Sequence, residues 1–178
     1  MINDYEATKP MTQDATYEST ASLSNDDVIS TLNGLIQTAK DGEEGYKAAA
    51  DAIERSDLKA LFYEFAQQRS RFAGELQSLV HALGGDPEST GSLSGSVHRG
   101  WMDLKAAVTG KNEQSILNDC ERGEDAAKDA YGDALQEGLP ANIMETVQEQ
   151  YTAILSAHDR VKALRDSAGG RSSSARTS

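Results

Sequence analysis

Four long segments of this chain repeat apolar residues at the spacing that places them on one face of an α-helix. They cover about residues 24–54, 57–83, 113–137 and 141–166. The first two segments and the last two are joined by short links, whereas residues 86–112 form a long connection. Short links join antiparallel neighbours, and a long connection can carry the chain back along a bundle. The pattern predicts an all-α, four-helix bundle made of two helical hairpins.

The long connection is expected to carry a short extra helix over residues 96–108, where Val97, Trp101 and Leu104 share one face. The segment 1–22 is polar and is expected to be disordered. The domain is predicted to cover residues 23–166. The remaining residues, 167–178, are rich in glycine and serine and are expected to form a flexible tail.

Composition agrees with helices and excludes several functions. Hydrophobic residues make up 38% and aromatic residues 6%, with only three prolines, which suits a helical bundle. Seventeen basic against 29 acidic residues leave a net charge of −12, which disfavours binding to nucleic acid and to anionic membranes. The single cysteine, Cys120, is typical of a reducing compartment. With no long apolar run and no secretory pattern in residues 1–22, a cytoplasmic location is expected.

Each long segment carries one polar residue on its apolar face. Gly42-Glu43 in the first segment recurs as Gly123-Glu124 in the third, and each glutamate falls on the apolar stripe. Arg69 lies on the stripe of the second segment and His158 on that of the fourth. A charged group in such a position is costly unless it has a partner. If the four residues meet inside the bundle, they form one polar cluster.

Depth along the helices supports part of this convergence. Glu43 and Arg69 lie equally far from the first turn, and the match between Glu124 and His158 about the second turn is looser by roughly one helical turn. One interpretation is a buried ion-pair network containing Arg69, with Glu75 on the flank of the same helix, that sets helix register. The other is a metal ion held by Glu43, Glu124 and His158. Neither interpretation includes a catalytic residue.

Several motifs in the same order resemble a mainly proteobacterial four-helix-bundle family of unknown function, itself similar to the ferritin-like rubrerythrins and bacterioferritins. The resemblance covers about residues 22–166. The motifs are Gly42-Glu43-Glu44-Gly45-Tyr46, Leu83-Gly84-Gly85-Asp86-Pro87, His98-Arg99-Gly100-Trp101, Glu121-Arg122-Gly123-Glu124 and His158-Asp159. The resemblance implies a ferritin-like bundle.

The ferritin-like superfamily implies a di-iron site with one glutamate from each of two helices and a Glu-x-x-His motif from each of the other two. Glu43 and Glu124 match the single glutamates. No Glu-x-x-His occurs in this sequence: Leu155 stands where helix four would supply the glutamate, and Arg69 and Phe72 occupy the corresponding depth of helix two.

Two functional hypotheses follow. The first is a non-catalytic ferritin-like protein, with a role in stress responses as one expectation, that acts by self-association as a dimer or larger homo-oligomer or by binding an unknown protein partner. The second is an atypical metal-binding protein with a degenerate di-metal site, for which iron or another divalent metal would be the cofactor. The missing motif favours the first hypothesis and leaves enzymatic activity open.

Overall fold

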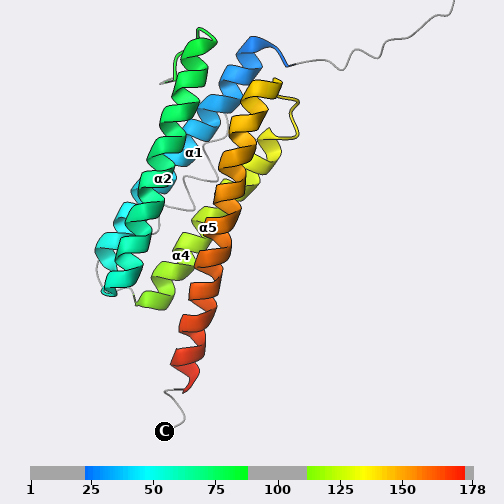
Figure 1. Cartoon of the computed structure of the whole chain (residues 1–178). Helices are drawn as coiled ribbons and strands as arrows, with labels where there is room; N and C mark the ends of the chain where they lie inside the picture. Colours follow the sequence, from blue (N-terminus) through cyan, green and yellow to red (C-terminus); the bar gives the residue numbers. More distant parts are fainter. Residues whose placement is uncertain (1–22, 88–111, 175–178) are drawn as a thin grey trace, which may run out of the picture.

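The computed structural model describes residues 23–87 and 112–174, and the side chains up to residue 170. It contains four helices: α1 (Asn25–Ala52), α2 (Ser56–Ala82), α4 (Glu113–Ala134) and α5 (Ala141–Ser174). Figure 1 shows two hairpins, α1 with α2 and α4 with α5, aligned along a common axis. The described residues confirm the all-α, four-helix architecture. The short helix expected at 96–108, with Trp101, lies outside the described residues.

Local chemistry explains where the helices begin and turn. The side chain of Ser24 accepts a hydrogen bond from the backbone N–H of Asp27 at the start of α1, and Asn112 does the same for Ser115 at the start of α4. After α2 and α4 the chain turns at Gly84, with φ of 77°, and Gly138, with φ of 79°. Glycine adopts this left-handed conformation at little cost, so each hairpin arm ends where the sequence predicts a break.

The core lies between the helices and is mostly aliphatic. Tyr46, Phe62 and Tyr131 are its largest uncharged side chains, and all three are fully buried. The ring of Tyr46 lies 5.8 Å from that of Phe62 and 5.2 Å from that of Phe65, measured between centroids. Aromatic pairs at this range stabilise a core beyond the area they bury. No helix among the described residues is both long and apolar enough to cross a membrane.

The last helix runs further than the sequence predicts. A helix ending at Asp166 and followed by a flexible tail was expected, whereas α5 continues to Ser174 and extends beyond the other helices (Figure 1). Ala168 is only 6% exposed and lies two helical turns after the buried Val161, on the same face. Packing of this apolar face extends the helix through Gly169 and Gly170, despite their poor helix propensity.

Candidate functional site

The most deeply buried charges of the described chain form an ion pair between α2 and α4. The guanidinium Nη2 of Arg69 donates to Glu124 Oε1 at 2.5 Å, and the side chains are 2% and 0% exposed. The hydroxyl of Tyr46, from α1, donates to the same oxygen at 2.6 Å. Three helices therefore converge on one carboxylate oxygen. Breaking such a pair from one side leaves an uncompensated buried charge.

Aromatic rings and an amide complete the surroundings of the arginine. Arg69 Nη1 donates to Gln68 Oε1 at 2.6 Å, and the guanidinium carbon lies 5.9 Å and 5.5 Å from the ring centroids of Tyr46 and Phe72. Contacts at this range add cation–π attraction. Burial alone would lower the pKa of Arg69, but the charge and hydrogen bond of Glu124, together with Tyr46 and Tyr131, more than offset burial and raise the pKa. The guanidinium is therefore held in its charged form.

The pKa of the Tyr46 hydroxyl is raised well above its usual value, mainly by burial and then by the neighbouring charge of Glu124. Both causes disfavour the phenolate. Tyr46 therefore stays a protonated donor to the carboxylate at neutral pH.

A second series of hydrogen bonds connects α4 with α5 and α2. The Tyr131 hydroxyl donates to Gln150 Oε1 at 2.8 Å, and Gln150 Nε2 donates to Glu75 Oε2 at 2.7 Å. Gln150 is buried, whereas Glu75, which accepts its hydrogen bond, is an exposed residue. Burial also raises the pKa of Tyr131. The predicted network residues Arg69 and Glu75 thus belong to two separate groups of hydrogen bonds.

Glu43, the other half of the Gly-Glu repeat, lies apart from this centre. Its carboxylate is 2.5 Å from Lys47 Nζ, one turn along α1, and the lysine side chain is 54% exposed. The preceding Gly42 does face the centre, since a Cβ at this position would lie 3.3 Å from Cγ of Arg69. The glycine of this repeat makes room for the arginine, while its glutamate turns toward the bundle surface.

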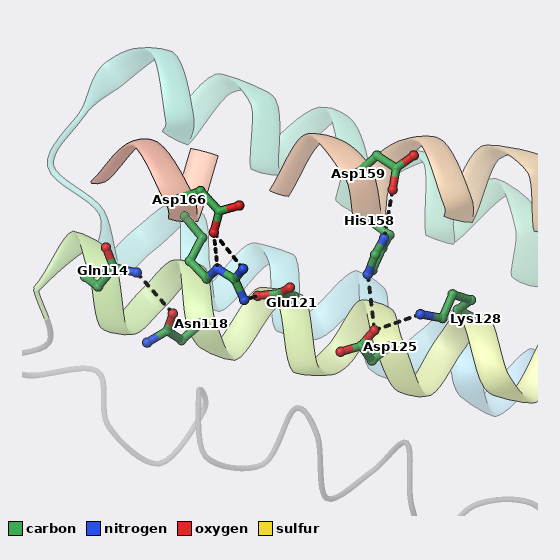
Figure 2. A network of polar contacts seen from close by, with 9 residues as sticks. Gln114, Asn118, Glu121, Asp125, Lys128, His158, Asp159 and Asp166 are labelled. Carbon is green, nitrogen blue, oxygen red and sulfur yellow. Dashed lines mark hydrogen bonds and ion pairs between the residues drawn. The ribbon is translucent and has the colours of Figure 1, made fainter. Parts of the chain in front are cut away.

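His158 belongs to a third group at the boundary between α4 and α5 (Figure 2). Its Nε2 lies 3.1 Å from Asp125 Oδ1 and its Nδ1 lies 3.1 Å from Asp159 Oδ1. Glu121, one turn from Asp125 on α4, is paired with Arg165 of α5. The structure thus places Glu43, Glu124 and His158 with three different sets of partners.

Comparison with known proteins assigns the chain to a family. Residues 27–137 match the model of the family described as a domain of unknown function, DUF2383. The chain belongs to this family. No curated protein matches it.

A crystal structure of a two-domain protein from Anabaena variabilis ATCC 29413, containing DJ-1/ThiJ/PfpI-like and ferritin-like domains, is similar to this DUF2383 protein with a TM-score of 0.69. Sequence identity is 18%, and the match covers 83% of this chain but only 41% of that protein. At this identity the likeness concerns the fold, and it confirms a ferritin-like bundle.

The core of this DUF2383 protein does not fit the di-iron centre that a ferritin-like fold implies. Two of the three residues that define its centre, Arg69 and Tyr46, supply a cation and a phenol instead of carboxylates and imidazoles. Glu124 Oε2 is buried without a hydrogen-bond partner in the described part of the chain. Among the described residues, however, the only group of three or more potential metal ligands lies elsewhere, at Glu121, Asp125 and His158. A single carboxylate oxygen is not a binding site for two metal ions.

The sequence analysis did not identify three residues of these polar groups. Tyr46 was named only as part of a motif, and its bond to Glu124 was not predicted. Glu121 and Asp125 were not singled out as ligands, although their spacing of four residues places both on one side of a helix. His158 lies about as far after Leu139 as Glu121 lies before it, which is the signal that pairs the two.

Proposed function

We propose that this DUF2383 protein is a non-catalytic ferritin-like bundle that acts through its surface, by self-association or by binding a protein partner. The observation that carries the proposal is the Arg69–Glu124 ion pair in the bundle core. It neutralises, with the chain's own cation, the carboxylate that a metal would need. Because the interior is filled by side chains of the chain itself, the surface is where other molecules can be recognised.

The electrostatics argue against metal oxidation in the core. A dication about 5 Å from a guanidinium, at an effective dielectric constant of about 20, is repelled by roughly 6–7 kcal/mol. That is comparable with the whole binding free energy of a micromolar ligand, about 8 kcal/mol. Iron held beside Arg69 and Glu124 would therefore be weakly bound.

The net charge of −12 favours protein partners over nucleic acid.

The alternative, an atypical metal protein using Glu43, Glu124 and His158, receives less support. Such a site needs its ligands to converge, whereas the nearest partners of the three are Lys47, Arg69 and Asp125 respectively.

Metal analysis and an oxidation assay on untagged protein test the proposal. We expect less than one iron atom per chain after dialysis, and oxidation of added Fe²⁺ by oxygen at the rate of buffer alone. Arg69→Ala, which removes the core cation, is expected to bind iron more tightly than the wild type. Two firmly held iron atoms per wild-type chain, with oxidation that depends on oxygen and protein, would make the protein an enzyme and end the proposal.

Self-association is tested by light scattering across a concentration series. We expect the mean mass to exceed 19.1 kDa, the mass of one chain, and to rise with concentration. If the protein stays a monomer at all concentrations, binding to a protein partner alone would remain as the proposed mode of action.

A further inference from the structure

We propose that Glu121 and Asp125 of α4 and His158 of α5 form a binding site for a divalent transition-metal ion of the zinc type. Each residue offers one ligand atom, and the three atoms lie within 4.8 Å of one another. The site lies at the α4–α5 boundary, away from the Arg69–Glu124 pair, and it does not depend on the proposed function.

The helices bring the three ligands together in a simple way. Glu121 and Asp125 are four residues apart, so their carboxylates lie on the same side of α4, one turn from each other. Figure 2 shows His158 reaching from α5 toward Asp125. The side chains of His158 and Glu121 are each 11% exposed, whereas that of Asp125 is 49% exposed. The site therefore has two sheltered ligands and one open side through which an ion can enter.

The contacts of the imidazole suit a bound cation. Both ring nitrogens of His158 face a carboxylate oxygen at 3.1 Å, Nε2 toward Asp125 and Nδ1 toward Asp159. A neutral imidazole carries one N–H and can donate to only one of them. The other nitrogen then presents a lone pair to an anion, which is unfavourable unless a proton or a metal ion lies between. With Nδ1–H directed at Asp159, the ring is oriented as carboxylates orient metal-binding histidines.

The charges around the site also favour a dication. In the described part of the chain, ion pairs link four carboxylates and two basic side chains at this site. The carboxylates belong to Glu121, Asp125, Asp159 and Asp166, and the basic groups to Lys128 and Arg165. Arg165 is shared between Glu121 and Asp166, and Lys128 lies 2.9 Å from Asp125. Arg165 can therefore release Glu121 to a metal while keeping its contact with Asp166.

The ligand types select the class of ion. Imidazole nitrogen, carboxylate oxygen and water are all ligands that Zn²⁺ accepts, the protein atoms at about 2.0–2.2 Å and the water in a fourth position. Mg²⁺ and Ca²⁺ take oxygen ligands and gain little from an imidazole. The three side chains must move closer around the ion, and they must displace Arg165 from Glu121. The site is therefore expected to prefer Zn²⁺ over Mg²⁺.

Calorimetry with Zn²⁺ on the untagged, chelator-treated full chain tests the site. We expect His158→Gln and Glu121→Gln to bind at least tenfold more weakly than the wild type. His81→Gln, at an exposed histidine of α2, controls for adventitious binding, and Glu43→Gln tests the ligand set Glu43, Glu124 and His158. Both controls are expected to match the wild type. Equal affinity in His158→Gln and wild type, or weakening by Glu43→Gln, would overturn the proposal.

A second measurement needs no variant. In nitrogen NMR of the wild-type imidazoles, Zn²⁺ is expected to shift one histidine from its metal-free signal to that of a metal-bound Nε2, and Mg²⁺ to leave it unchanged. A histidine set that does not respond to Zn²⁺ would overturn the site. Calorimetry and NMR both test this site separately from the proposed function, because neither measures Fe²⁺ oxidation or changes Arg69.

Discussion

The two glutamates of the Gly-Glu repeat have the same local sequence and opposite environments. Glu124 is fully buried and receives hydrogen bonds from Arg69 and Tyr46. Glu43 meets Lys47, a surface residue one turn away. The difference comes from the helix that each one faces. Arg69 of α2 contacts the carboxylate on α4, whereas the carboxylate on α1 is 21% exposed and contacts a lysine of its own helix.

The comparison shows how a buried carboxylate of a ferritin-like bundle is neutralised by a side chain of the same chain. A pair of inward carboxylates requires a cation, and in this protein a guanidinium supplies the charge at one of them. The other, Glu43, is 21% exposed and pairs with Lys47. Each half of this contrast can be tested separately.

The largest effect is expected from Arg69→Ala. It leaves the Glu124 carboxylate buried without its cation, so the free energy of unfolding should fall by about 3–5 kcal/mol. Arg71→Ala removes an exposed arginine from the same helix and should change it by less than about 0.5 kcal/mol. Chemical denaturation of the two variants measures both. A loss below about 1 kcal/mol for Arg69→Ala would show that the pair does not stabilise the core.

Tyr46→Phe should have the next largest effect. It removes a hydrogen bond to a charged group, which is worth about 1.5–3 kcal/mol. Denaturation at neutral pH measures the loss, with Tyr63→Phe at an exposed tyrosine as control. A Tyr46→Phe variant as stable as the wild type would mean that Arg69 alone holds Glu124.

The same tyrosine predicts a pH dependence. The pKa of Tyr46 is raised in the folded state above its ordinary value of 10.0, so the unfolded chain loses this proton first. The stabilisation is complete below about pH 10 and is lost as the pH rises toward the folded-state pKa. Unfolding measured from pH 8 to 11 should show a decline that is smaller in Tyr46→Phe. Parallel profiles for the two proteins would contradict this origin.

Gly42→Ala probes the space beside the arginine. Alanine improves helix propensity by about 1 kcal/mol, but the new Cβ would lie 3.3 Å and 3.4 Å from Cγ and Cδ of Arg69. Gly74→Ala is the matched control, because a Cβ there meets nothing within 4 Å. We expect Gly74→Ala to stabilise the protein and Gly42→Ala to be less stable than that control by about 1–2 kcal/mol. Equal gains in both would show that the arginine is free to move.

The smallest change in unfolding free energy is expected at Glu43, the more exposed glutamate of the repeat. Glu43→Gln breaks a surface contact with Lys47 and should cost less than about 0.5 kcal/mol. The same denaturation assay measures it. A loss similar to that of Arg69→Ala would place Glu43 in the core network and remove the contrast between the two glutamates.

Helices and turns were predictable because their signals are local. The cap at Ser24 and the breaks at Gly84 and Gly138 depend on nearby residues alone. The extension of α5 was missed because the packing of Ala168 outweighs the glycines that follow it. The family resemblance supplied the ferritin-like topology, which periodicity by itself does not specify.

The pairing of inward residues was less predictable, because one residue along a helix turns the side chain by about 100°. On α2 the core receives Phe62 and Val80, whereas their neighbours Leu61 and Leu79 are half-buried. Arg69 is buried, as its place on the apolar stripe of the second segment predicted. The contact of Glu43 with Lys47 was not predicted, because a glutamate at the edge of an apolar stripe can also reach a nearby lysine at the surface.

The coupling between Arg69 and Glu124 tests the central claim most directly. It is obtained from the unfolding free energies of the wild type, Arg69→Met, Glu124→Gln and the double variant. Each single change should be strongly destabilising and the double variant should recover part of the loss, with a coupling energy of about 2–3 kcal/mol. Additive effects, with a coupling below about 0.5 kcal/mol, would contradict the account that this ion pair holds the core in place of metal.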